Sequence, residues 1–156
     1  MGSCVHDTFV LDKTYANPLP RVFAAFADPA LKEAWYAHSP AHDKLSYALD
    51  FRPDGEERLS ARMREGTPIA GKELCWTGRY IEIAENQRIV FSQTLDMDGI
   101  RLSGAIVTLE FAGLANDGTT LTLTHQAVYF DGADGPEMRR MGWQFLLDAA
   151  EAVVAA

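Results

Sequence analysis

The order of the expected secondary-structure elements constrains the fold of this chain more than any other feature. The residue pattern predicts one N-terminal strand, then two short helices, then a series of antiparallel strands, and finally one long amphipathic helix at the C-terminal end. A sheet that curves around a single long helix tends to enclose a cavity, and concave apolar cavities bind small molecules. The pattern therefore predicts an α+β fold with space for a ligand.

Alternating apolar and polar residues predict the strands, most clearly in residues 119–129. Apolar residues and one histidine share one face of this segment: Leu121, Leu123, His125, Ala127 and Tyr129. The opposite face is mostly threonine. A period of two that is sustained over this length is typical of a strand and incompatible with a helix.

Turn sequences divide the rest of the chain into further strands, which gives a sheet of about seven. These strands are expected at residues 8–15, 47–51, 59–64, 72–84, 88–94 and 105–111. The separating turns contain Asp54-Gly55, Asn86, Asp98-Gly99 and Asp117-Gly118. Residues 37–46 show no period and predict a loop, and Gly78 suggests a kink in its strand.

Three helix starts are visible in the sequence. Asn17 before Pro18 and Asp28 before Pro29 predict caps for the two short helices. Asp134 is the expected cap of the final helix, followed by Pro136 in the first turn. One apolar stripe of that helix is expected to face the sheet: Met138, Met141, Gly142, Phe145, Leu146, Ala149 and Val153.

Composition and charge exclude several classes of function. The 156 residues suit one domain spanning 1–156, and 47% are hydrophobic. Fourteen Lys and Arg oppose 22 Asp and Glu, and the net charge of −8 argues against nucleic-acid binding. We interpret the densest basic positions as solvent-exposed: Arg62, Arg64, Arg139 and Arg140.

The sequence offers no sign of export, membrane insertion or a cofactor. Cys4 and Cys75 lack metal or redox spacing, so we expect free thiols in a reducing compartment and a cytoplasmic location. No apolar run predicts a membrane span, and no signal peptide is recognisable. His38 and His42 are four apart, but Pro40 between them argues against a metal site. No phosphate-binding loop or nucleophile motif predicts a cofactor or a common enzyme mechanism.

Ordered motifs along nearly the whole chain resemble the START-like (SRPBCC) superfamily. The similarity is closest to bacterial proteins that resemble the C-terminal domain of the activator of the heat-shock-protein-90 ATPase. The motifs are residues 18–29 with Trp35, then 51–55, 78–83, 88–91, 107–109, 118–124 and Gly142-Trp143. Asp54 stands where a second glycine is common. The resemblance implies a helix-grip fold, in which a curved antiparallel sheet grips the C-terminal helix over a cavity.

Candidate ligand-binding residues are the large side chains expected on the inner faces of the sheet and helix. Aromatic and methionine members are Trp35, Tyr47, Trp76, Phe91, Tyr129, Met138, Met141 and Phe145. His125 and Gln93 are candidate polar anchors. Each of these residues could instead fill the core, and a hydrogen-bonded core histidine is the alternative interpretation of His125.

Three functions are compatible with this sequence. The first is a binding protein for a small apolar or aromatic molecule. The second is an aromatase/cyclase-like enzyme that would use His125, Gln93 and Tyr129. The third is a chaperone-associated module, as the resemblance implies, although we expect a single domain here, without the further N-terminal domain of the activator. Homodimer formation through a sheet edge or through the helix is a further alternative.

Overall fold

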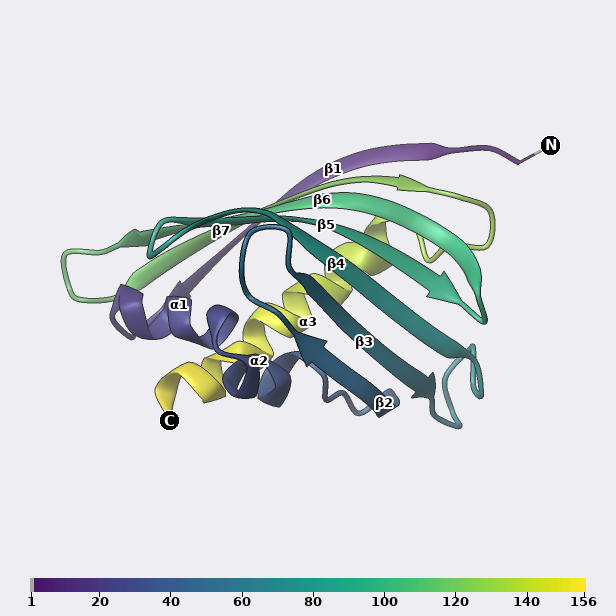
Figure 1. Cartoon of the computed structure of the whole chain (residues 1–156), viewed down its shortest axis with the longest axis horizontal. Helices are drawn as coiled ribbons and strands as arrows, with labels where there is room; N and C mark the ends of the chain where they lie inside the picture. The colour runs from purple at the N-terminus through teal and green to yellow at the C-terminus, as the bar shows by residue number, and fades with distance from the viewer. Residues whose placement is uncertain (1) are drawn as a thin grey trace.

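The computed structural model describes residues 2–156. They form one curved antiparallel sheet and three helices, joined by turns and loops. The sheet order is β1-β7-β6-β5-β4-β3-β2. The strands are β1 (Val5–Tyr15), β2 (His42–Leu49), β3 (Glu56–Met63), β4 (Glu73–Ala84), β5 (Arg88–Met97), β6 (Ile100–Gly113) and β7 (Thr119–Tyr129). The helices are α1 (Leu19–Ala27), α2 (Pro29–Tyr36) and α3 (Pro136–Ala155). All three lie on the same side of the sheet (Figure 1). The predicted helix-grip fold is confirmed.

Consecutive hairpins build six of the strands, and β1 then pairs with β7 at one edge. The predicted turns have the backbone that tight hairpins require. Asp98 and Gly99 both have positive φ, 49° and 81°, as a two-residue turn of this kind demands. Asp54, Asn86 and Asp117 also adopt positive φ in their turns. Short polar side chains tolerate this conformation, which explains why the hairpin positions were readable from sequence.

Two of the three predicted caps are wrong. Asp28 does cap α2, because its Oδ1 accepts bonds from the backbone nitrogens of Ala30 and Leu31. At α1 the cap position is Pro18, and the Asn17 carbonyl instead accepts a bond from Thr119. At α3 the cap is Gly135 with φ 87°. Asp134 is engaged by the guanidinium of Arg139, a stronger partner for a carboxylate than backbone amides.

Two local features of the sheet also differ from expectation. The predicted loop at residues 37–46 ends early, because β2 already begins at His42. Gly78 pairs regularly with Glu57 and Gln93, so the expected kink is absent there. The irregularity falls between Tyr80 and Glu82. Backbone bonds from Tyr80 to the β2–β3 turn accompany this bulge.

The buried face of α3 lies one residue further along than predicted. Its buried side chains are Arg139, Trp143, Leu147, Ala150 and Val154. Within the expected stripe, Met138, Met141 and Phe145 are exposed, at 61%, 70% and 47%. Apolar residues cover so much of the surface of α3 that the sequence pattern allows either the predicted or the observed face to be buried. Contact with the sheet and with the other helices decides between them.

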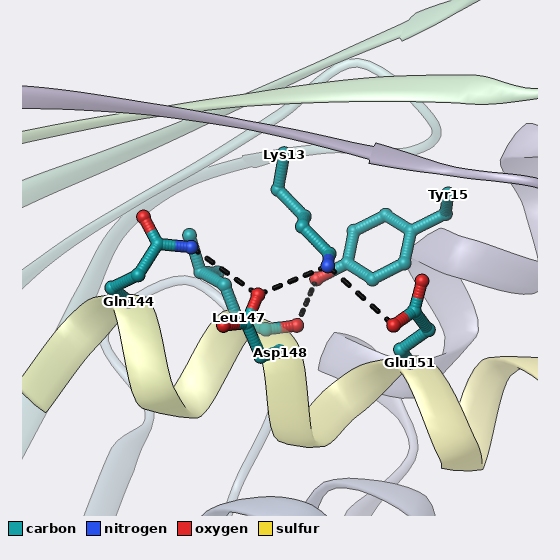
Figure 2. A network of polar contacts seen from close by, with 6 residues as sticks. All are labelled: Lys13, Tyr15, Gln144, Leu147, Asp148 and Glu151. Carbon is teal, nitrogen blue, oxygen red and sulfur yellow. Dashed lines mark hydrogen bonds and ion pairs between the residues drawn. The ribbon is translucent and has the colours of Figure 1, made fainter.

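The C-terminal half of α3 packs directly against β1 (Figure 2). The Tyr15 hydroxyl donates to the Leu147 carbonyl at 2.8 Å, and this contact is fully buried on the tyrosine side. At the solvent edge, Lys13 forms ion pairs with Asp148 at 3.0 Å and with Glu151 at 3.6 Å. The main hydrophobic core lies around this half of the helix.

Candidate functional site

A pocket of about 640 Å³ lies between the sheet and the N-terminal half of α3. Most of its lining is apolar: Leu59, Met63, Ile69, Leu74, Trp76, Leu95, Met97, Leu102, Met138, Trp143, Phe145 and Leu146. The volume falls within the range of roughly 300–1,000 Å³ that is typical of small-molecule sites. The pocket is therefore large enough for a drug-sized ligand.

The alternation of side chains and the pairing register of the strands determine which residues form the wall of this pocket. Trp76 pairs with Leu95, and Leu74 pairs with Met97, across β4 and β5. Leu102 from β6 joins Leu74 and Leu95 in a small buried cluster, separate from the main core. Because alternate residues of a strand point to the same face, a few positions on three strands form a continuous apolar wall.

Tyr36 and Gln93 form a polar pair inside the pocket. They are 4% and 5% exposed, and the Gln93 Nε2 donates to the Tyr36 hydroxyl at 2.9 Å. Burial, reinforced by the negative charge of Glu57, raises the pKa of Tyr36 well above its ordinary value. The phenol therefore stays protonated and keeps its capacity to donate a hydrogen bond.

Arg139 is a second polar group of the pocket, and its predicted solvent exposure is wrong. The side chain is 8% exposed and binds both carboxylate oxygens of Asp134, at 2.7 and 2.8 Å. Its Nη2 also donates to Ser103 at 2.9 Å, and the guanidinium stacks over the Tyr129 ring. Pairing on several sides allows this charge to be buried. Arg140, by contrast, is exposed as expected.

A buried ion pair lies behind the pocket and positions Tyr36. Lys32 on α2 and Glu57 on β3 are each 3% exposed, and their closest atoms are 2.8 Å apart. The Tyr47 hydroxyl donates to the same carboxylate at 2.6 Å, and Lys32 Nζ lies 4.6 Å from the centre of the Tyr36 ring. This network joins α2 to β3, which holds Tyr36 at the pocket wall.

The predicted ligand-binding residues divide into two groups. Gln93, Trp76, Met138 and Phe145 line the pocket. Trp35, Tyr47, Phe91, Tyr129 and His125 lie in other surroundings, and Met141 points to solvent. The Trp35 indole donates to the Ala25 carbonyl, and Phe91 packs on Trp143. A role in ligand binding stays a prediction for all ten residues.

His125 is fully buried against packed side chains. Its ring stacks on Phe9 with centroids 4.6 Å apart, and neither ring nitrogen has a partner among the described residues. Burial, and secondarily the nearby Arg139 charge, lowers its pKa from 6.5 to about 4. The imidazole is therefore neutral near pH 7. The hydroxyl of Tyr129, on the same face of β7, is likewise unpartnered within the described residues.

The structure offers no metal centre in residues 2–156, where no cluster of three or more potential ligand side chains occurs. His42 instead lines the pocket, and its Nε2 lies 3.1 Å from the Ala37 carbonyl. Within the same residues, no helix is both long enough and apolar enough to cross a membrane.

Sequence reasoning missed several polar residues of the pocket, among them Tyr36, His42 and Arg139. A weak signal existed for Arg139, since Asp134 lies five residues earlier, just before the helix, where its carboxylate can pair with the guanidinium. Tyr36 lies one helical turn after Lys32, so both point from the same face of α2. Neither spacing is specific enough to identify a binding site.

A curved antiparallel sheet with a C-terminal helix across a pocket defines the class of helix-grip proteins. Within this class, the chain belongs to the family described as "Activator of Hsp90 ATPase homolog 1-like protein", which matches residues 16–155. No curated protein matches the chain.

Solved structures extend this result. A protein from Rhizobium leguminosarum has a TM-score of 0.91 and 30% identity, covering 99% of this chain and 98% of that one. A protein from Rhizobium loti has a TM-score of 0.83 and 34% identity, covering 97% and 99%. An AHSA1-like protein from Aeromonas hydrophila shares the fold, with a TM-score of 0.68, 21% identity and coverage of 96% and 92%.

Proposed function

We propose that this protein binds a small apolar or aromatic molecule in the pocket beneath β3–β6. The supporting observation is the pocket itself, whose volume of about 640 Å³ is lined mainly by apolar side chains with a few buried polar groups. That combination is the usual composition of a small-molecule site, in which apolar contact supplies affinity and polar groups set orientation. We propose the cytoplasm as its location, on the strength of the free thiols of Cys4 and Cys75.

Gly142 offers a direct test, because it lies on α3 at the pocket and has open space around it. A Cβ added at this position would meet no atom within 4 Å. Replacing glycine inside a helix with a better helix former also stabilises the helix, by about 1 kcal/mol for alanine. Gly142→Phe should therefore fill the pocket without disrupting the fold, whereas Gly142→Ala leaves most of the volume open.

The measurement is a fluorescence titration with N-phenyl-1-naphthylamine, a neutral apolar probe. We expect saturable binding to the wild type and to Gly142→Ala, and binding at least about tenfold weaker to Gly142→Phe. Thermal unfolding of all three proteins controls for folding. Equal affinity of the wild type and Gly142→Phe would place the probe elsewhere and overturn the proposal.

The family match favours a second candidate function, that of a chaperone-associated module. The description of the family names activation of the Hsp90 ATPase. Exposed apolar residues on α3, Met138 and Met141 among them, could contact a partner. The test is the ATPase rate of a purified Hsp90-type chaperone with and without this protein. An increased rate supports this function, and an unchanged rate excludes activation.

An aromatase/cyclase-like reaction has less structural support. His125, the expected proton-transfer group, packs against Phe9 and does not line the pocket. A general base must come within hydrogen-bond reach of the proton that it removes. Gln93, by contrast, does line the pocket, where an amide can orient a ligand but cannot serve as a base at neutral pH.

A further inference from the structure

We infer that the ligand of this pocket is an uncharged molecule with an apolar body and one hydroxyl or carbonyl group, recognised by Tyr36 and Gln93. The inference rests on the proposed function of the pocket as a small-molecule site. It names the chemical class of the ligand and the two residues that would select it.

The Tyr36–Gln93 pair has unused hydrogen-bonding capacity. Their mutual bond uses one N–H of the amide and one lone pair of the phenol oxygen. The phenol proton and the amide oxygen make no other side-chain bond within residues 2–156. Rotating the amide by half a turn exchanges its oxygen and nitrogen, and the pair then offers an amide N–H and a phenol lone pair instead. In either arrangement at least one donor and at least one acceptor remain for a ligand.

A ligand hydroxyl can use both the free donor and the free acceptor of this pair, because it accepts one hydrogen bond and donates another. A ligand carbonyl can use only the free donor. The two side chains are almost fully buried, so an unmatched ligand would leave them unsatisfied away from water. Leaving buried polar groups unpaired costs more than forming their bonds gains. A pure hydrocarbon of the same shape should therefore bind less tightly than its hydroxylated analogue.

The charges around the pocket argue that the ligand is neutral. Arg139 is paired with both oxygens of Asp134, and Lys32 behind the wall is paired with Glu57. Each buried cation already has its anion, so a carboxylate ligand would lose its hydration without gaining a free countercharge. The protein also carries a net charge of −8, which disfavours anions further.

The apolar part of the pocket accommodates the body of such a molecule. Trp76 and Leu95 pair across β4 and β5, and Trp143 of α3 lines the same pocket. Aromatic and branched apolar side chains on both sides suit a ring system, which can pack against them over its whole surface.

Calorimetric titration with naphthalene, 2-naphthol and 2-naphthoate at pH 7 tests this inference. The three probes share one ring system and differ only in the polar group. We expect 2-naphthol to bind about fivefold more tightly than naphthalene, as one net hydrogen bond allows. We expect 2-naphthoate to bind at least about tenfold more weakly than 2-naphthol, because its charge stays uncompensated.

Two variants assign the selectivity to the pair. In Tyr36→Phe and in Gln93→Met, the ratio of 2-naphthol to naphthalene affinity should fall toward one. Tyr15→Phe is the matched control, since it also removes one buried phenol oxygen but lies outside the pocket lining. It should retain the wild-type ratio. Circular dichroism and thermal unfolding verify that each variant folds.

The outcomes distinguish failure of the proposed small-molecule function from failure of the inferred ligand class. If none of the three probes binds to the wild type, the proposed small-molecule function fails. If naphthalene binds as tightly as 2-naphthol, or if 2-naphthoate binds most tightly, the pocket still binds ligands but the inferred class is wrong. A ratio that is unchanged in both pocket variants would also overturn the inference.

Discussion

The two halves of α3 belong to one continuous helix and yet have opposite surroundings. Leu147, Ala150 and Val154 in the C-terminal half are buried to 0%, 0% and 1% exposure in the main core. In the N-terminal half, Met138 and Phe145 line the pocket and are 61% and 47% exposed. The C-terminal half is packed into the core, whereas the N-terminal half borders open volume along part of its surface.

This difference shows how a small fold can hold a pocket and remain stable. Direct contacts anchor the C-terminal half, including the Tyr15 bond and the Lys13 ion pairs (Figure 2). The N-terminal half is anchored by Arg139, which reaches Asp134 and Ser103. Dense packing in the C-terminal half contributes the stability that the open pocket beside the N-terminal half does not supply.

The largest effect should come from truncating one residue in each half. Leu147→Ala leaves a cavity in packed surroundings and should lower the free energy of unfolding by about 3 kcal/mol. Phe145→Ala removes a half-exposed ring beside open space and should cost less than about 1 kcal/mol. Urea denaturation of both variants gives the two values. Similar losses would mean that the halves are equally packed.

An intermediate effect should follow from pH, through His125 beneath the helix. Burial lowers the folded-state pKa of His125 to about 4, against 6.5 for the free side chain. The unfolded chain therefore gains a proton first as the pH falls. The contribution of neutral His125 to the stability of the folded state is complete well above pH 6.5. That contribution is lost progressively as the pH falls to about 4.

Between pH 7 and pH 5 this linkage should lower the free energy of unfolding by about 2 kcal/mol. Denaturation at both values, for the wild type and for His125→Leu, measures the difference. The variant should lack this part of the decrease, because leucine does not titrate. An identical decrease in both proteins would assign the acid sensitivity to other groups.

The smallest effect should come from Tyr15→Phe, which removes the hydroxyl bonded to the Leu147 carbonyl. Loss of one buried hydrogen bond should cost about 1 kcal/mol of stability. Because the bond belongs to the packed half, the affinity for N-phenyl-1-naphthylamine should not change. A marked loss of probe affinity would show that the packed half also controls the pocket.

Much of the fold could be predicted because its signals are local. Positive-φ residues such as Asp98 and Gly99 mark hairpins, and the period of two in residues 119–129 marks a strand. The site was predictable only in part. Gln93 and Trp76 lie at the pocket as their strand phase suggested, whereas His125 has an inward phase but packs against Phe9. The alternation of side chains along a strand predicts which face of the sheet a residue occupies. It does not predict whether that face borders open space.

By itself the sequence determined the order of elements, the hairpins and the inward faces of the strands, because each depends on neighbours along the chain. Tertiary structure alone decided which side of α3 is buried, how Arg139 is paired with Asp134, and where the pocket lies. These depend on groups that are remote in sequence, such as Ser103 beside Arg139. A cavity is the volume that no side chain fills, and that quantity exists only once the chain is packed.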